Sequence, residues 1–424
     1  MKIRLAILLL CLLGGAASAQ VTAGSVHCDR LLDVRTGRVL LNQLVAFDST
    51  GMITSVGPAG AAAPTVDLPN ATCLPGLIDV HTHITGDASM HGYRALGISI
   101  PRETTIGVKN ARITLRAGFT TIRSVGAEGF TDVAVRDAIN AGDIEGPRMM
   151  VSGPALGITG GHCDENLLPF EYHRTGEGVA DGPWAARQKV REVIKYGADV
   201  IKICASGGVL SKGDQAAATQ YTLEEMQAIA AEAHKLGRKV AAHAHGAESI
   251  RDAIRAGIDS VEHSSLIDDE GIRLAKEHGT YLVFDIYNDD YILAMGEKAG
   301  MLPESIEKEK QIGRLQRENF RKAFQAGAKM AFGTDAGVYP HGENARQFAK
   351  MVEWGMKPLD AIQAATIHAA DLLGWSDKVG TLEKGRYADL IAVDGDPLAD
   401  VKVLENVRFV MKGGAVVRND IPRR

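Results

Sequence analysis

The sequence predicts an α/β fold, a (β/α)8 TIM barrel with a small β-sandwich domain formed by both chain ends. The middle of the chain alternates short apolar runs with helical patterns, and eight such runs can be counted. Several helical patterns end in Gly just before the next run, as expected for a helix C-cap. Both ends of the chain instead show short alternating strands separated by turns.

Length and composition are those of an ordinary globular protein. The 424 residues are 45% hydrophobic and 23% charged, and the formal net charge is −5. No run of Lys or Arg stands out, so we expect no nucleic-acid partner.

The first nineteen residues read as a secretory signal peptide. Lys2 and Arg4 flank the start of a short apolar run that ends at Leu13, and Ala17-Ser18-Ala19 fits the small-residue cleavage pattern. The run is too short to span a bilayer. We therefore expect an exported, periplasmic or secreted protein without stable membrane insertion after the signal is removed.

The rest of the chain divides into three segments. Residues 20–73 form the N-terminal part of the sandwich, residues 74–375 the barrel, and residues 376–424 the C-terminal part of the sandwich. The sandwich strands are expected at 31–34, 39–47, 53–56, 387–393, 407–411 and 415–417.

The barrel strands are expected at the eight apolar runs, which are Gly76–Val80, Thr120–Ser124, Arg148–Ser152, Val200–Ala205, Val240–His245, Ser260–His263, Leu282–Ile286 and Met330–Gly333. Between them, Thr222-Leu223-Glu224-Glu225 has the order of a capping box and opens a helix that runs to about Leu236. Further helices are expected at 247–256, 268–278 and 305–326. No phosphate-binding fingerprint follows the first strand, which removes the main nucleotide-binding interpretation.

Four cysteines follow the predicted signal peptide. Cys28 and Cys73 flank the same N-terminal segment and could pair in an oxidising compartment. The simpler interpretation, four buried thiols, is the one we favour. Cys163 and Cys204 lie near the candidate site residues and could bind metal, although neither belongs to a Cys-x-x-Cys motif.

Ligand-type side chains stand at five of the predicted strand ends, where barrel enzymes carry their active sites. They are His81 and His83 on the first strand, Lys202 on the fourth, His243 and His245 on the fifth, His263 on the sixth and Asp335 after the eighth. The i, i+2 spacing places both histidines of the first strand on one face. Each residue alone has a simpler explanation, such as a core histidine, a turn-capping aspartate or a salt-bridged lysine. Together they favour a metal site, because buried ionisable groups are costly unless paired or metal-bound.

These motifs resemble those of the amidohydrolase superfamily. The matching stretches are 75–83, Lys202, His243, His263, Gly333-Thr334-Asp335 and the C-terminal stretch 380–391. The stretches 160–162, 201–208 and 243–246 further resemble a subgroup that contains Xaa-Pro dipeptidases, other carboxypeptidase-like dipeptidases and amidohydrolases that cleave ochratoxin A. The likeness covers essentially the whole mature chain.

The resemblance implies two divalent metal ions, usually Zn²⁺. His81, His83 and Asp335 would hold one ion, His243 and His263 the other, and a CO2-derived carbamate on Lys202 would bridge them. A protonated lysine has no lone pair for a cation, whereas a carbamate offers two anionic oxygens. A metal-activated hydroxide would then attack an amide carbonyl, with Asp335 as the catalytic residue that carries the proton to the leaving nitrogen.

The resemblance also implies a small-molecule substrate with an amide next to a C-terminal carboxylate, such as an Xaa-Pro dipeptide or an N-acyl amino acid. His162 and Tyr221 are the candidates for binding that carboxylate, with His245 and His341 as further contacts. The segment 86–105, which carries Arg94 and Arg102, could form a lid.

Two alternatives stay open. A cyclic-amide hydrolase of the hydantoinase or dihydroorotase type would share the bridging lysine, and a barrel without catalytic function would have lost ligands that this sequence retains. Relatives are often homo-oligomers, sometimes octamers, so we expect a homo-oligomer.

Overall fold

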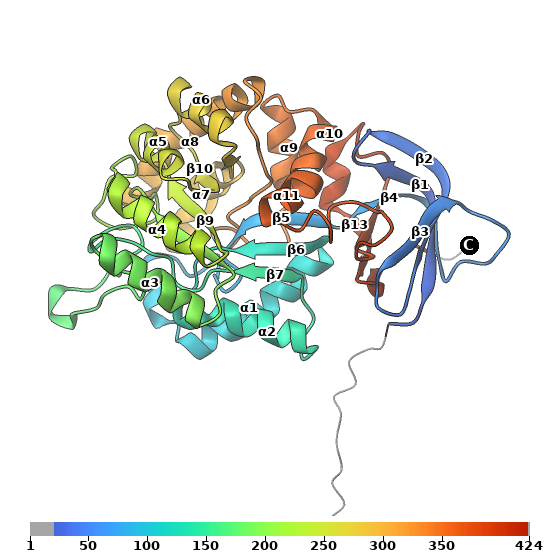
Figure 1. Ribbon diagram of the computed structural model, residues 1–424, viewed down its shortest axis with the longest axis horizontal. Coiled ribbons are helices and arrows are strands. Elements are labelled where there is room, and N and C mark those ends of the chain that lie inside the picture. The colour runs from blue at the N-terminus through green and yellow to red at the C-terminus, as the bar shows by residue number, and fades with distance from the viewer. Residues whose placement is uncertain (1–20, 423–424) are drawn as a thin grey trace, which may run out of the picture.

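The computed structural model describes residues 21–422, and the predicted signal peptide lies outside the described residues. The described chain forms a sheet built from both chain ends and a larger body of parallel strands wrapped by helices (Figure 1).

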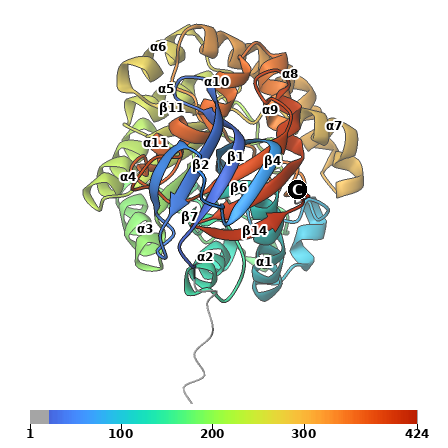
Figure 2. The ribbon, with the colours of Figure 1, turned by 90° about the vertical axis from the view of Figure 1, so that its right-hand side faces the viewer.

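The two chain ends meet in one seven-stranded sheet with the order β14-β13-β12-β4-β1-β2-β3 (Figure 2). At its centre β4 (Val66–Pro75) pairs in parallel with β1 (Gly24–Asp33) and antiparallel with β12 (Leu390–Asp394). The other strands are β2 (Arg38–Phe47), β3 (Ile53–Pro58), β13 (Val407–Lys412) and β14 (Ala415–Asn419). The predicted pairing of the chain ends is therefore present, and the sheet continues two residues beyond the expected boundary at residue 73.

The described residues of these ends form a single sheet and not the two separate sheets of a sandwich. The reason is that β4 joins strands from both ends into one continuous ladder. The sheet curls back on itself, because the Ile53 amide donates to the Arg386 carbonyl over 2.8 Å and the Gly385 amide donates to the Ile53 carbonyl over 2.8 Å. The curl encloses a core of its own, which includes Val26, Phe47 and Phe409.

Seven of the eight predicted barrel runs are strands, arranged in two parallel sheets. The first sheet holds β5 (Leu77–Thr82), β6 (Phe119–Ser124) and β7 (Arg148–Val151), and the second holds β8 (Val200–Cys204), β9 (Lys239–Ala244), β10 (Ser260–His263) and β11 (Tyr281–Val283). A single parallel bridge between Leu156 and Ile203 links the two sheets on one side.

The eighth run, 330–333, is not a continuous strand in the described chain. Single bridges join Met330 to Leu282 and Ala336 to Thr82, so the segment still lies between β11 and β5. The Phe332 amide leaves the ladder and donates to the Ala364 carbonyl over 3.0 Å, and Asp335 turns the backbone with φ 59°. These two features interrupt the extended conformation that an unbroken strand requires.

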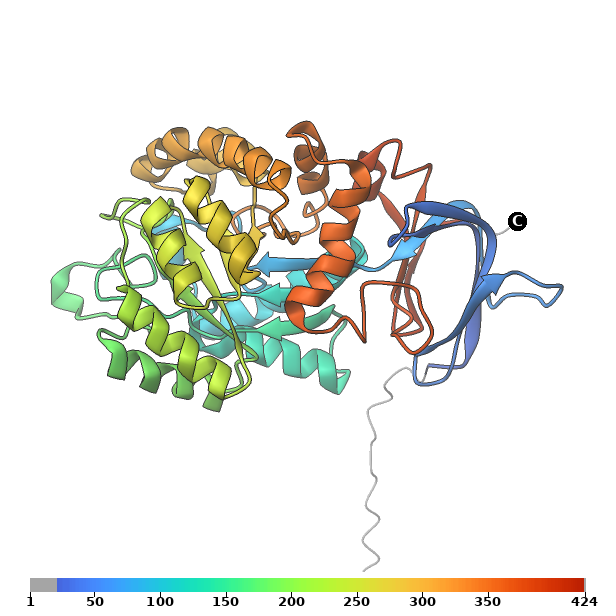
Figure 3. The same ribbon diagram turned by 45° about the horizontal axis from the view of Figure 1, so that its top comes forward.

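Helices surround the parallel strands (Figure 3). They are α1 (Ile100–Arg116), α2 (Thr131–Ala141), α3 (Pro183–Lys195), α4 (Leu223–Lys235), α5 (Ala247–Arg255), α6 (Asp269–His278), α7 (Asn288–Ala299), α8 (Pro303–Gln325), α9 (Arg346–Glu353), α10 (Pro358–Gln363) and α11 (Ala369–Leu373). The predicted capping box of α4 is confirmed, since the Thr222 side chain accepts from the Glu225 amide and the Glu225 carboxylate accepts from the Thr222 amide. None of the helices in residues 21–422 is long and apolar enough to cross a membrane.

The strands β6 and β7 run away from the seven-stranded sheet (Figure 1). Their C-terminal ends therefore form the edge of the parallel strands that faces away from that sheet. This is the edge at which the sequence places its ligand-type side chains.

Candidate active site

A cavity of about 480 Å³ lies at the C-terminal ends of the parallel strands. Most of the predicted ligand residues line it, namely His83, Lys202, His243, His263 and Asp335. His81 is fully buried next to the cavity and contacts Asp335. The volume falls in the range of small-molecule sites.

The end of β5 and the turn after residue 333 supply the first half of the cluster. Asp335 Oδ1 lies 3.0 Å from His83 Nε2 and 3.4 Å from His81 Nε2. Asp335 is held there because its amide donates to the His81 carbonyl over 2.7 Å. The i, i+2 spacing thus brings both imidazoles to one carboxylate, as the strand period predicts.

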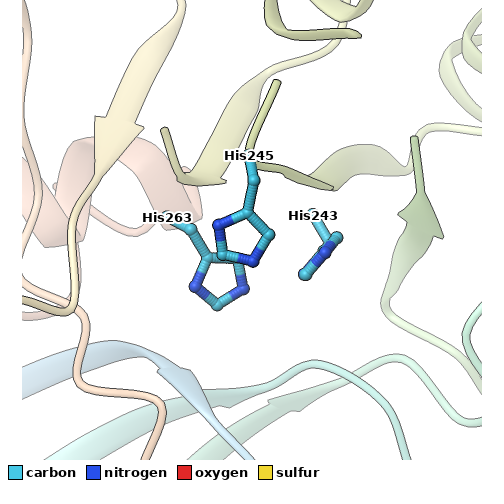
Figure 4. Close-up of side chains that lie close together, drawn as sticks. All are labelled: His243, His245 and His263. Atoms are coloured by element: carbon cyan, nitrogen blue, oxygen red, sulfur yellow. The ribbon is translucent and has the colours of Figure 1, made fainter. Parts of the chain in front are cut away.

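The ends of β9 and β10 supply the second half (Figure 4). The ring of His263 lies 4.6 Å from that of His243 and 4.8 Å from that of His245, between centroids. His263 also joins the two halves, because its ring centroid is 4.9 Å from that of His81. Two groups here have ligand atoms close enough to share a metal ion, His243 with His245 and His263, and His81 with His263 and Asp335.

The hydrogen bonds of the imidazoles fit a metal site. Metal-binding histidines usually engage their second ring nitrogen with a carbonyl or carboxylate. Here His83 Nδ1 contacts the Gly126 carbonyl at 3.2 Å, His243 Nε2 the Gly207 carbonyl at 2.9 Å, and His263 Nδ1 the Asp285 carboxylate at 3.0 Å. Each ring therefore keeps its other nitrogen for the cluster.

His81 gives the strongest indication of a missing partner. Its ring is fully buried, and neither of its nitrogens has a hydrogen-bond partner among residues 21–422. Nδ1 lies 3.2 Å from Glu262 Oε2, which also lacks a hydrogen bond there. A buried polar atom without a partner is costly, so a metal ion on Nε2 would satisfy a group that the chain leaves open.

Burial favours the neutral form of His81, His243 and His245, and the neutral imidazole is the form that binds metal. Burial, followed by nearby cationic groups, sets the pKa of His81, His243 and His245 well below the ordinary value. Burial alone would raise the pKa of Asp335, but His81 and His83 more than offset it, and its pKa lies below the ordinary value. The carboxylate is therefore ionised at neutral pH.

Lys202 lies inside β8 with its side chain in the cavity and is only 4% exposed. Burial lowers the pKa of its ammonium group to about 8. A larger neutral fraction of the amine is therefore present near pH 7 than for an exposed lysine.

Of the residues expected to bind substrate, the structure brings His162 and His245 to the cavity. His162 stacks on His243 with 4.1 Å between ring centroids, and its Nδ1 has no hydrogen-bond partner in the described chain. His245 Nδ1 contacts the Ser265 hydroxyl at 2.7 Å and leaves Nε2 toward the cavity residues.

Tyr221 and His341 lie elsewhere, so the sequence-based expectation for them needs correction. Tyr221 is fully buried, and the carbonyls of Gly157 and Ala180, 2.9 and 3.1 Å away, are the acceptors for its single hydroxyl hydrogen. His341 is also buried, and its Nε2 contacts the His83 carbonyl at 3.1 Å. Neither residue is among the described residues that line the cavity. Both hold the backbone around the site.

The favoured interpretation of four buried thiols is wrong, and the alternative that Cys28 and Cys73 pair is confirmed. Cys28 is disulfide-bonded to Cys73, and Cys163 to Cys204, each with 6.0 Å between Cα atoms. Cys163 and Cys204 line the cavity as a disulfide and are therefore unavailable as thiolate ligands. The bond ties the loop that carries His162 to the strand that carries Lys202.

The segment 86–105 contributes to the cavity wall, but Arg94 and Arg102 are not among the described residues that line it. Arg94 instead donates to the Lys298 carbonyl over 2.7 Å. The segment contains a short 3-10 helix, Gly92–Gly97, before α1 begins.

Three side chains that support the site were not predicted from the sequence. Asp79 accepts hydrogen bonds from the Thr334 hydroxyl at 2.5 Å and from Asn344 at 2.8 Å, and so fixes β5 against the turn that leads to Asp335. Asp285 orients His263, and Glu262 lies behind His81. Asp79 and Glu262 lie inside apolar strands, and an acidic residue in such a strand is the sequence feature that could have identified them.

Comparisons with known proteins agree with this geometry. Residues 72–417 match the model of the amidohydrolase family. The chain is 35% identical over 369 residues to ochratoxinase from Aspergillus niger. The aligned region covers 81% of this chain and 75% of that protein.

Solved structures give the same relationship. A Xaa-Pro dipeptidase with bound methionine in its active site has a TM-score of 0.87 and 37% identity, and the match covers 93% of this chain and 99% of the other. The A. niger ochratoxinase structure has a TM-score of 0.83 and 31% identity, with 94% and 96% covered. These relatives imply a TIM barrel with an additional domain, and they confirm the predicted resemblance and a hydrolase that acts on amide bonds. The chain belongs to the amidohydrolase family.

Proposed function

We propose that this chain is an exported, metal-dependent hydrolase that cleaves the amide or peptide bond next to a C-terminal carboxylate. The observation that carries the proposal is the convergence of histidines, Asp335 and Lys202 on one cavity of about 480 Å³. Similarity to an ochratoxinase and to a Xaa-Pro dipeptidase supports linear substrates of two kinds, N-acyl amino acids such as ochratoxin A and dipeptides such as Xaa-Pro.

The donor set suits two divalent ions, which we propose to be zinc. His81, His83 and Asp335 would hold one ion, and His243 and His263 the other. When bound, the ions would polarise the substrate carbonyl and lower the pKa of the attacking water.

Lys202 is suited to a carbamate between the two halves. Its neutral amine nitrogen would form a bond to the carbon of CO2 and lose one proton, which leaves an anionic carboxylate. The lowered pKa of about 8 makes the reactive neutral amine accessible near physiological pH. A carbamate also replaces a cation that metal ions would repel.

Asp335 is the candidate proton carrier. Its Oδ1 lies 3.0 Å from His83 Nε2, and its Oδ2 accepts a hydrogen bond from Asn288 at 3.0 Å. An ionised carboxylate in this fixed position can accept the proton of the attacking water and deliver it to the leaving nitrogen. Asp335→Asn should therefore lower kcat by about 10²- to 10⁴-fold. Near-normal turnover would contradict the assignment.

His162 and His245 are the candidates for the substrate carboxylate. Both line the cavity, and a neutral imidazole can donate one N–H to an anionic oxygen. Replacing His162 by Asn should raise KM more than it lowers kcat.

Export rests on the predicted signal peptide and is supported by the two disulfides, because structural disulfides persist mainly in oxidising compartments. We expect a homo-oligomer of up to eight subunits. Light scattering of the purified chain tests this prediction.

A substrate panel tests the proposed function. It contains dipeptides with varied C-terminal residues, N-acyl amino acids and cyclic imides, and product analysis identifies the bond that breaks. We expect linear amides with a free C-terminal carboxylate to be cleaved and their C-terminal amides to be poor substrates. Cleavage of cyclic imides alone would instead favour the hydantoinase or dihydroorotase type.

A further inference from the structure

One wall of the cavity carries a carboxylate that the proposed reaction does not use. Glu309 lies on α8, and with Ile312 and Gln316 it forms the helix face that lines the cavity. Its side chain is only 5% exposed, and no hydrogen bond joins it to another group in residues 21–422. A buried carboxylate of this kind is costly without a partner.

The basic residues of α8 on either side of Glu309 are paired with other carboxylates. Lys308 binds Asp214 at 2.7 Å, and Arg317 binds Asp289 at 2.9 Å. Burial and the neighbouring Asp289 raise the pKa of Glu309 to about 8, which agrees with a carboxylate that lacks a positive partner. Without a cation beside it Glu309 is therefore mostly protonated near pH 7, and a cationic group in the cavity would favour its ionised form.

The helix is also shaped around this carboxylate. Gly313 lies inside α8, where glycine costs about 1 kcal/mol relative to alanine. A Cβ at that position would lie 2.6 Å from Glu309 Oε1 and 2.5 Å from Asp289 Oδ1. The glycine thus leaves room for both carboxylates, and a larger residue would displace them.

The rest of the cavity has the same sign of charge. Apart from Glu309, Asp335 and Asp285, its lining contains six carboxylates and two basic side chains, buried Lys202 and exposed Arg174. Such a lining favours a substrate that brings a positive charge, because like charges in a cavity of low dielectric repel.

We propose that Glu309 is a specificity-determining residue that binds a cationic group of the substrate, an ammonium or a guanidinium. The inference rests on the proposed function and narrows its substrate class. Dipeptides with a free α-amino group or a basic side chain are the intended substrates, and N-acyl amino acids without a cation are poor ones.

Matched substrate pairs test this inference in the metal-loaded enzyme. One pair compares a dipeptide with its N-acetylated form, and the other compares C-terminal lysine with norleucine. In the wild-type chain we expect kcat/KM to favour the cationic member of at least one pair by about tenfold or more. Glu309→Gln should reduce that ratio to near one, mainly through KM, and Glu309→Asp should retain part of it. The pair that responds identifies which cation Glu309 binds.

Glu318→Gln is the matched control, because Glu318 lies on the same helix at the surface, paired with Arg314. It should leave both ratios unchanged. Equal losses for cationic and neutral substrates in Glu309→Gln, or a wild-type ratio near one, would overturn the inference while the amide hydrolase assignment stands.

A binding measurement distinguishes failure of the proposed amide hydrolysis from failure of the proposed role of Glu309. Free lysine should raise the melting temperature of the wild-type chain more than norleucine does, and this difference should vanish in Glu309→Gln if the side chain is recognised. If α-amino recognition applies, glycine ethyl ester should stabilise the wild-type chain more than its N-acetylated form does. Absence of hydrolysis of every linear amide, with a cation-dependent shift intact, would refute the proposed function alone. Absence of any cation-dependent shift or ratio would refute the role of Glu309.

Discussion

The pair formed by Arg123 and Glu262 allows a quantitative prediction. Arg123 Nη2 lies 2.8 Å from Glu262 Oε1, and the two side chains are 1% and 0% exposed. The guanidinium also donates to the Ser260 hydroxyl over 3.0 Å and to the Val80 carbonyl over 2.5 Å. Glu262→Gln keeps the size of the side chain but removes the only carboxylate that contacts this guanidinium among the described residues.

Removing one partner of a buried ion pair typically costs about 3–5 kcal/mol, because the other charge stays buried and uncompensated. For a chain of this size each kcal/mol corresponds to about 2 °C, so the metal-free variant should melt roughly 6–10 °C below wild type. The assay is thermal unfolding followed by circular dichroism.

The same substitution tests the metal site, because Glu262 Oε2 lies 3.2 Å from His81 Nδ1. Losing a group that orients a metal-binding histidine typically lowers metal affinity by about 10- to 100-fold. Competition with a chelator measures this affinity.

Glu145→Gln is the matched control. Its partner Arg116 lies 3.0 Å away, but the side chains are 39% and 35% exposed, so the pair should contribute at most about 1 kcal/mol. If Glu262→Gln melts and binds metal like Glu145→Gln, the buried pair neither stabilises the fold nor supports the metal site.

Three further predictions follow from the site. Lys202→Ala should lower metal occupancy and activity, with partial rescue by short carboxylic acids that replace the carbamate oxygens; full occupancy and normal activity without rescue would argue against a bridging lysine. Replacing both Cys163 and Cys204 by Ala should lower the melting temperature, with about 4 kcal/mol expected from chain entropy, and also reduce kcat/KM, because the bond ties His162 to the strand of Lys202. The disulfide between Cys28 and Cys73 closes a loop of similar length, so replacing both cysteines by Ala should lower stability but leave kcat/KM unchanged. Equal losses of kcat/KM in the two double variants would contradict a role of the Cys163–Cys204 bond in positioning the site. The pKa of Glu309 is raised from 4.5 to about 8, so the native chain binds more protons than the unfolded chain between these values, and the melting temperature should fall as pH rises from about 5 to 8. Glu309→Gln should flatten that fall, and an unchanged slope would exclude Glu309 as its source.

The sequence predicted side-chain positions correctly where the periodicity of a strand or helix fixes the direction in which side chains point. The i, i+2 spacing of His81 and His83 and the rule that barrel sites lie at strand ends are local or topological, and they brought the ligand set to one cavity. The capping box at Thr222 is equally local and was predicted to the residue.

Other features depend on contacts between distant segments. The bond between Cys163 and Cys204 spans 41 residues, and no spacing motif announces it. Tyr221 precedes a helix in sequence, but its direction is set by the carbonyls of Gly157 and Ala180. The single curled sheet likewise depends on β4, which pairs with both chain ends. Such pairings are three-dimensional and leave only weak traces in one sequence.

We propose that the cluster of histidines, Asp335 and Lys202 holds metal that drives amide hydrolysis. The most direct measurement determines metal per chain by elemental mass spectrometry while dipeptide hydrolysis is followed through chelation and reloading. We predict about two equivalents per active chain, loss of activity on chelation, recovery on reloading, and an Asp335→Asn variant that stays metal-bound but turns over poorly. Full hydrolytic activity in a metal-free chain would contradict the claim.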